Sequence, residues 1–282
     1  MIREAARFAA GWLPRPVRSH LARRRFGYAG SGAEFALRRT VRPDGTSAIA
    51  MADGPSFLIP PGIEKDFSFH FVENADSRDE MASFMRLSRA MPADALLLDV
   101  GAHKGLFSLV HLALGPRHRA LLLDPSAPLA REAAALLRIN DTGDRGEILV
   151  AGAGADNATR RIVTDALGFA QAAGDGTGDA VPFTTIDHLC EARGIVPALV
   201  KIDVEGAEAD VLRGARATLR AHRPVVCLEL HFDELERRGE SAGALLEELA
   251  AMGYRFESTT GQALAVWRLR RSLMAIVRVV AR

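Results

Sequence analysis

The chain has 282 residues, of which 48% are hydrophobic and 25% are charged, and its formal net charge is +1. These proportions are those of an ordinary globular protein with a substantial core, and they exclude a fibrous or largely disordered chain. No apolar run approaches the roughly 20 residues that a membrane-spanning helix needs. The two cysteines, Cys190 and Cys227, fall in a predicted helix and a predicted buried strand. We therefore expect free thiols, a reducing compartment and a cytoplasmic location.

The N-terminal segment is strongly basic. Residues 1–42 hold ten arginines against two glutamates, a local net charge of +8. Within it, residues 1–13 have the apolar spacing of a short basic amphipathic helix. Such a helix can make weak contact with a membrane surface, here the inner membrane face, or pack on its own domain or on a second subunit of a homo-oligomer. The basic arm raises RNA methylation as a third possible function. The catalytic half of the chain lacks an interleaved aromatic and basic stacking surface, so we expect no nucleic-acid partner.

The segment up to residue 93 predicts strands followed by a helix. Phe67, Phe69 and Phe71 alternate with polar residues, which is the period of a half-buried strand. Ser77 and Glu80 then have the spacing of a capping box, which predicts a helix of about 14 residues ending before Pro92.

Beyond residue 94, short apolar runs alternate with helical patterns. This alternation predicts a parallel sheet with right-handed crossovers. Helices are expected over 129–140, 186–193 and 208–222, a hairpin excursion over 159–180, and a terminal antiparallel hairpin formed by 254–257 and 263–269. Four of the strands end in an acid, namely Asp99, Asp124, Asp203 and Glu229. With the strand order 3-2-1-4-5, Asp99 and Gly101 face Asp203 across the ligand-binding edge of the sheet.

The first of these strands leads into a glycine-containing turn. The sequence Leu96-Leu97-Leu98-Asp99-Val100-Gly101-Ala102-His103-Lys104-Gly105 predicts a buried strand, a sharp turn and the start of a helix. The amides of a helix N-terminus favour an anionic group, although a tight turn without a ligand remains the alternative. The turn lacks the glycine spacing that pyrophosphate requires, and Asp124 is placed to accept the ribose hydroxyls of a nucleoside. S-adenosylmethionine offers a carboxylate, a ribose and an adenine, and it is the cofactor that we predict.

Three motifs carry a resemblance to a known family. They are Leu98 to Gly105, Asp124-Pro125, and above all Val200-Lys201-Ile202-Asp203-Val204-Glu205-Gly206-Ala207-Glu208. Over about residues 94–258 the chain resembles the FkbM-type methyltransferases. The resemblance implies an α/β, Rossmann-like class I fold with a mostly parallel seven-stranded sheet. It also implies S-adenosylmethionine-dependent O-methylation of a hydroxyl on a sugar, a glycan or another small molecule.

Carried over residue by residue, the resemblance assigns a cofactor site. Its residues are Asp99, Gly101, Ala102, His103, Gly105, Asp124, Pro125 and Asp203. His103 stands where the family usually has Asn, and Asp124 stands where it usually has Glu. Both departures change the reach of the side chain and keep its hydrogen-bonding capacity.

Methyl transfer to an alcohol is helped by a general base. The candidates are Asp203, Glu205, Glu229 and His231, of which we assign Asp203, Glu229 and His231 to catalysis and favour His231 as the base. Glu205 has an alternative role as a cap of the turn into the following helix. Lys201 is expected to pair with a neighbouring acid. A metal is not required by the spacing of Asp203, Glu229 and His231, and we predict none.

These observations divide the chain into three parts. Residues 1–93 form a basic arm and a β/α extension for acceptor binding or oligomer contacts, residues 94–270 the methyltransferase domain, and residues 271–282 a basic tail. The alternative function is that of a non-catalytic peripheral membrane or scaffold protein that retains a methyltransferase fold.

Overall fold

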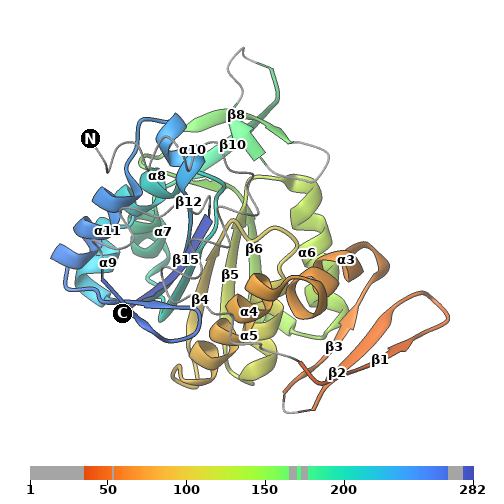
Figure 1. The fold of residues 1–282 in the computed structure, drawn as a ribbon. Coiled ribbons are helices and arrows are strands. Elements are labelled where there is room, and N and C mark those ends of the chain that lie inside the picture. The colour runs from red at the N-terminus through yellow and green to blue at the C-terminus, as the bar shows by residue number, and fades with distance from the viewer. Residues whose placement is uncertain (1–34, 53, 165–169, 173–176, 266–275) are drawn as a thin grey trace, which may run out of the picture.

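A computed structural model of the chain describes residues 35–52, 54–164, 170–172, 177–265 and 276–282 (Figure 1). The predicted amphipathic helix over residues 1–13 and most of the basic arm lie outside the described residues. Among the helices of the described residues, none is long and apolar enough to cross a bilayer.

The molecule is built on a main sheet with the order β14-β13-β15-β12-β11-β4-β5-β6, eight strands within the described residues. Strands β6, β5, β4, β11 and β12 pair in parallel, so the predicted order 3-2-1-4-5 is confirmed. The bounds of the strands are β4 Leu96–Val100, β5 Arg119–Asp124, β6 Gly146–Val150, β11 Leu199–Ile202, β12 Val225–His231, β13 Phe256–Ser258, β14 Ala263–Leu264 and β15 Ile276–Ala281.

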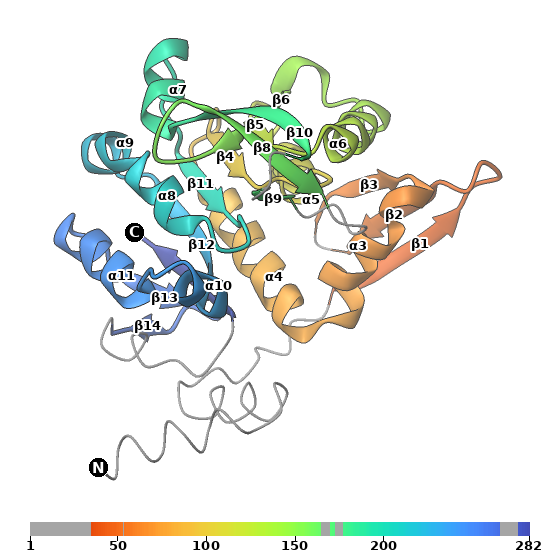
Figure 2. The ribbon, with the colours of Figure 1, turned by 90° about the horizontal axis from the view of Figure 1, so that it is seen from above.

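Helices cover both faces of this sheet, which explains why all five residues of β4 are buried. One face, which carries Leu97 and Leu122, packs on α4, α5 and α6, and the other, which carries Leu98 and Val200, packs on α7, α8, α9 and α11 (Figure 2). Such two-sided burial is typical of parallel sheets. The helices are α4 Ala75–Arg89, α5 Leu106–Leu114, α6 Ala127–Ile139, α7 Ile186–Arg193, α8 Glu208–Arg213, α9 Arg216–His222, α10 Phe232–Arg237 and α11 Ala242–Ala251.

The helix predicted over 208–222 is two helices. The chain is interrupted between α8 and α9, where Gly214 packs so closely on the backbone carbonyl of Gly154 that a Cβ would overlap it. Tertiary packing that the sequence pattern does not show therefore divides a continuous apolar periodicity.

The C-terminal segment differs from the expected tail and hairpin. β13 and β14 do pair antiparallel, but β15, Ile276–Ala281, inserts between β12 and β13 and pairs antiparallel with both. Part of the segment predicted as a basic tail over 271–282 is thus an inner strand of the sheet. Val280 and Ala281 are apolar and buried. Burial of these side chains explains why the segment forms a strand although arginines flank it.

The N-terminal extension forms a separate three-stranded sheet and short helices. The strands are β1 Leu37–Val41, β2 Ser47–Met51 and β3 Ser56–Ile59, in antiparallel order. They are followed by the 3-10 turn η1 Pro61–Ile63, by α3 Glu64–Ser68 and by the π-helical segment η2 Phe69–Glu73.

The strand predicted from the alternating phenylalanines is therefore wrong. Phe67 and Phe71 stack with ring centroids 4.5 Å apart, whereas Phe69 is exposed. A spacing of four residues places two side chains on one helix face, so the same three positions also fit a helix.

The helix predicted after this segment is confirmed as α4, but its cap differs. The side chain of Asn74, not Ser77, accepts hydrogen bonds from the amides of Asp76 and Ser77.

The predicted excursion between β6 and β11 is confirmed as a second small sheet, in the order β7-β10-β8-β9. Its antiparallel pair β8–β10 lies beyond the end of the main sheet where β12 runs into α10 (Figure 1). The bounds are β7 Gly152–Ala153, β8 Thr159–Thr164, β9 Ala170–Ala172 and β10 Asp179–Thr184, with the 3-10 turn η3 Gly143–Arg145 before β6.

Substitutions in β15 test whether the C-terminal segment is an inner strand of the sheet, because substitutions in an inner strand destabilise a protein more than substitutions in an exposed tail. We expect Ala281→Asp to destabilise the protein by more than about 3 kcal/mol, because Ala281 is fully buried and would become an unpaired buried charge. The neighbouring Arg282→Ala removes only an exposed side chain paired with Glu257 and should cost less than about 1 kcal/mol. Urea unfolding of both variants measures the difference, and equal, small effects would show that β15 is dispensable.

Candidate active site

The turn after β4 is held against two neighbouring strands. Gly101 and Gly105 have positive φ angles of 78° and 77°, a conformation that favours glycine. The amides of Gly101 and Ala102 both donate to the carbonyl of Leu123, at 2.9 and 3.0 Å. A Cβ at Gly101 would overlap the backbone carbonyl oxygen of Asp203. The ends of β4 and β11 are therefore in direct contact, and only glycine at position 101 allows it.

Asp124, at the end of β5, connects this turn to the next helix. Its Oδ2 accepts from the amide of His103 at 2.8 Å, and its Oδ1 accepts from the amide of Ser126, the N-cap of α6, also at 2.8 Å. Pro125 separates Asp124 from Ser126 in the sequence. Burial raises the pKa of Asp124 to about 6 even though both hydrogen bonds favour the carboxylate. The predicted cofactor residues at 101, 103 and 124 thus lie together.

Asp99 has a different position from these residues. It is only 1% exposed, and its Oδ2 accepts a hydrogen bond of 2.6 Å from the hydroxyl of Ser108 in α5. Burial raises its pKa. Asp99 therefore lies beneath the turn, where it fixes the first turns of α5.

The glycine turn also contacts the N-terminal extension. Lys104 forms ion pairs with Asp66 of α3 at 3.0 Å and with Glu132 of α6 at 3.2 Å. His103 Nδ1 lies 3.6 Å from Asp66. The extension therefore closes one side of the turn.

Lys201 is a buried charge in the middle of the sheet. Its Nζ lies 3.0 Å from Asp203 Oδ2 and 3.9 Å from Glu80 Oε1, which confirms the prediction that it pairs with an acid. It also lies 4.4 Å from the centre of the Phe107 ring. Burial would lower the pKa of Lys201, but the surrounding carboxylates outweigh burial and raise it. Lys201 thus remains charged.

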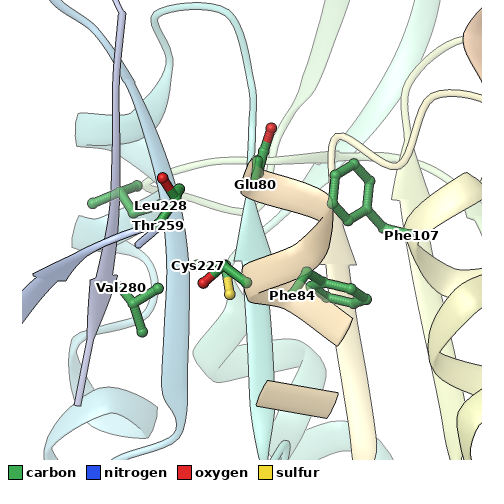
Figure 3. Close-up of a pocket in the computed structure, with 8 residues that line it drawn as sticks. Glu80, Phe84, Phe107, Cys227, Leu228, Thr259 and Val280 are labelled. Carbon is green, nitrogen blue, oxygen red and sulfur yellow. The ribbon is translucent and has the colours of Figure 1, made fainter. Parts of the chain in front are cut away.

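Glu80 is a site residue that the sequence analysis did not assign. It comes from α4 and lines a narrow pocket between α4 and β12, together with Phe84, Phe107 and Cys227 (Figure 3). Because Glu80 and Phe107 both contact Lys201, this pocket adjoins the lysine ammonium. A lysine within an apolar strand indicates that a buried partner exists, but it does not indicate which helix supplies it.

His231, at the end of β12, is surrounded by the acids of the site. Its Nε2 lies 3.3 Å from Glu205 Oε2 and 3.9 Å from both Asp203 Oδ1 and Glu229 Oε1. Its Nδ1 lies 2.7 Å from Oε1 of the fully buried Glu208. The structure thus brings together the three residues assigned to catalysis.

The protonation of His231 follows from these neighbours. Burial alone would lower its pKa, but the hydrogen bond to Glu208 and the charges of Asp203, Glu205 and Glu208 raise the pKa to about 9. At neutral pH the ring therefore carries a proton on both nitrogens, which argues against the free-base role favoured from the sequence.

Glu205 belongs to this group and is not a helix cap. The N-cap of α8 is Ala207, which makes no side-chain cap, and the amide of Gly206 donates to Glu208 Oε1 at 2.9 Å. The capping alternative for Glu205 is therefore wrong. Glu205 itself has a φ of 50°, a left-handed conformation that is uncommon for a residue other than glycine. Burial raises its pKa, opposed by His231.

Comparison with known proteins identifies the family. A sequence profile of the methyltransferase FkbM domain matches residues 99–256, more than half of the chain. The chain belongs to the FkbM methyltransferase family. The large mostly parallel sheet of this family member has the class I, Rossmann-like arrangement that the sequence predicts. Within the described residues it has eight strands, where the sequence predicts seven.

Individual similar proteins are distant. The AMB antimetabolite synthetase AmbE of Pseudomonas aeruginosa is 28% identical in an alignment of 217 residues, and the match covers 61% of this chain and 10% of AmbE. An FkbM methyltransferase structure from Methylobacillus flagellatus KT is 16% identical with a TM-score of 0.47, over 72% of this chain and 48% of that one. Cofactor-bound Rv0187 from MTB is 15% identical with a TM-score of 0.42, over 79% and 95% of the two chains. The chain thus spans a tenth of AmbE and about half of the M. flagellatus protein.

The contact between Gly101 and Asp203 can be tested against a second glycine of the same conformation. Gly143 also has a positive φ, but a Cβ there would meet nothing within 4 Å. We expect Gly143→Ala to cost about 1 kcal/mol, the left-handed penalty alone. Gly101→Ala should cost at least about 3 kcal/mol, because overlap with the backbone is added. Urea unfolding measures both, and an equal cost would contradict the close packing of the two turns.

Proposed function

We propose that this family member is an S-adenosylmethionine-dependent O-methyltransferase that acts on a hydroxyl of a small molecule, a sugar or a glycan. The main support is an arrangement of two groups at the carboxyl edge of one sheet. Asp124 and the glycine turn form the first group, and Asp203, Glu229 and His231 form the second. The direct contact between Gly101 and Asp203 places the two groups side by side. Ligands of open α/β sheets bind at this edge.

The first group fits the polar parts of the cofactor, whose sulfonium supplies an activated methyl group. Each oxygen of Asp124 accepts one backbone amide. A carboxylate has about four acceptor sites, so Asp124 retains capacity for the two ribose hydroxyls. The turn over 101–105 and the N-terminus of α5 favour the cofactor's carboxylate. Class I methyltransferases generally use this cofactor.

The second group suits the reacting end of the cofactor. Asp203, Glu205 and Glu229 surround His231, and their negative charge favours a sulfonium cation. In the transfer, the bond between the acceptor oxygen and the methyl carbon forms while the carbon–sulfur bond breaks. The hydroxyl proton passes to a carboxylate, Asp203 or Glu229. Alignment of the reacting atoms supplies most of the rate enhancement.

The acceptor and partners remain proposals that follow from the surroundings of the site. The extension contacts the turn through Asp66, and the strands β8 and β10 lie beyond the same end of the sheet (Figure 1), so both would contact the acceptor. We propose no nucleic-acid partner. For residues 1–42 we propose weak contact with the inner membrane face or contact between subunits of a homo-oligomer, with the enzyme itself in the cytoplasm. A non-catalytic scaffold would not need the paired Lys201 and Asp203 beside His231, and this charged group favours an enzyme.

The role of Asp124 predicts how the cofactor product S-adenosylhomocysteine binds. Asp124→Asn should weaken binding by about tenfold to a hundredfold, because hydrogen bonds to a charged acceptor contribute about 1.5–3 kcal/mol. Affinity of the unaltered protein should fall as the pH drops through about 6, where Asp124 takes up its proton. The variant should lose this dependence. Calorimetric titration at pH 5 to 7.5 measures both effects.

The matched control is His103→Asn, in the same turn. The hydrogen bond from His103 to Asp124 comes from the backbone amide, which Asn retains, so this variant should bind within about tenfold of the unaltered protein. Absence of binding in correctly folded unaltered protein would exclude the proposed function.

Transfer itself is tested by a screen of hydroxylated acceptors with methyl-labelled S-adenosylmethionine, read by mass spectrometry. With an acceptor found, Asp203→Asn should lower kcat by about a hundredfold and leave S-adenosylhomocysteine affinity within about tenfold. Of the two carboxylates that could take the proton, Asp203 is the more exposed, at 28% against 6% for Glu229, and so is the more accessible to a substrate. An unchanged kcat would remove Asp203 from catalysis.

A further inference from the structure

Three side chains at the ends of β11 and β12 have the geometry of a metal-binding set. Asp203, Glu205 and His231 each offer one ligand atom, and the three atoms lie within 4.8 Å of one another. Nε2 of His231 is 3.3 Å from Glu205 and 3.9 Å from Asp203. Around an octahedral ion with bonds of about 2.1 Å, adjacent ligand atoms are about 3 Å apart and opposite ones about 4.2 Å. The observed separations lie within or close to this range.

Glu208, which is outside this set, orients the His231 ring for metal binding. Glu208 in α8 is fully buried, and its Oε1 accepts the Nδ1 hydrogen of His231 at 2.7 Å. Metal-bound histidines almost always donate their second ring nitrogen to a carboxylate, a carbonyl or a water. This contact orients Nε2 towards Asp203 and Glu205.

The other oxygen of Glu208 is an independent sign that positive charge is lacking here. Glu208 Oε2 is buried and has no hydrogen-bond partner among the described residues, although buried polar atoms are nearly always paired. Four carboxylates, those of Asp203, Glu205, Glu208 and Glu229, lie within 4 Å of the His231 ring nitrogens. The Lys201 ammonium pairs with one of the four, Asp203, at 3.0 Å. Carboxylates gathered this closely favour the binding of a dication.

We propose that Asp203, Glu205 and His231 bind one divalent cation of the Mg²⁺ or Mn²⁺ class, although the sequence alone predicts no metal. Carboxylates are oxygen ligands of the kind that Mg²⁺ and Mn²⁺ take. The ion replaces the Nε2 proton of His231, which is released to solvent. Lys201 holds Oδ2 of Asp203 at 3.0 Å, so Oδ1, the oxygen nearer to His231, takes the ion.

The function of the ion rests on the proposed methyltransferase activity. An ion held at this edge would bind the acceptor hydroxyl, lower its pKa and orient its oxygen towards the methyl group. With Asp203 on the ion, Glu229 is the carboxylate that takes the hydroxyl proton. Its Oε1 lies 3.9 Å from His231 Nε2.

The site is tested with Mn²⁺ alone, titrated into the full chain without cofactor and followed by electron paramagnetic resonance and calorimetry. Glu205→Gln is the decisive variant, because Glu205 is 41% exposed and its amide keeps the size of the side chain. Glu234→Gln is the matched control. Glu234 is 38% exposed and packs beside Gly206, but it is outside the ligand set.

We expect one Mn²⁺ per chain with a Kd below about 100 µM, the range of metal sites built from few carboxylates. Glu205→Gln should raise the Kd at least tenfold, and Glu234→Gln should leave it within twofold. Thermal unfolding confirms that both variants are folded. No saturable binding, or equal binding by Glu205→Gln, overturns the proposal.

S-adenosylhomocysteine binding without metal separates the two proposals. If S-adenosylhomocysteine binds and Mn²⁺ does not, the metal site is excluded and the methyltransferase proposal stands. If Mn²⁺ binds with the expected variant pattern and S-adenosylhomocysteine does not, the metal site stands and the proposed function is excluded.

Discussion

The buried ammonium of Lys201 is the interaction on which the charged part of this site depends. A buried charge is tolerated only when opposite charges surround it. Lys201 pairs with Asp203, which directly follows β11, and with Glu80 of α4 in the N-terminal extension. In the sheet, Lys201 lies beside Asp99 of β4 and Cys227 of β12. Since side chains at paired positions point to the same face, polar groups from three strands gather on the α4 and α5 side. The extension is thereby tied to the site through Glu80.

The sequence was sufficient for elements whose periodicity is regular and whose partners are local. α7, Ile186–Arg193, has the predicted bounds, and β5 ends at the predicted Asp124, because an amphipathic pattern and an apolar run ending in an acid each have one interpretation there. It was insufficient where non-local contacts decide. The spacing of Phe67, Phe69 and Phe71 fits a strand or a helix, and only packing of Phe67 on Phe71 settles it. Likewise, the close contact of Gly214 with Gly154, 60 residues earlier in the chain, divides the predicted helix into α8 and α9.

In the candidate site, too, some residues could be predicted from the sequence and others depend on non-local contacts. Asp124, Asp203 and His231 could be proposed from strand ends, because the carboxyl ends of parallel strands share one edge. Glu80 and Glu208 could not. Glu80 reaches the site through the packing of α4 on α5, in which Phe84 contacts Phe107 edge to face. Glu208 had the appearance of a first-turn helix acid, yet it is fully buried against His231.

The two turns that meet at the site share an unusual backbone feature. Among the described residues, four that are not glycine have a positive φ, and two of them, His103 and Glu205, occupy the turns after β4 and β11. Each strained residue carries a group into the site. The amide of His103 reaches Asp124, and the carboxylate of Glu205 reaches His231.

Left-handed backbone costs about 1–3 kcal/mol at such positions and persists where the surroundings hold it in place. Here the surroundings are Gly101 against the Asp203 carbonyl and Gly206 against Glu234. Neither glycine can carry a side chain without displacing the other turn or α10. The packing that joins the two turns therefore also keeps Asp124 and Glu205 in place, which couples the proposed cofactor-binding and metal-binding groups through the backbone.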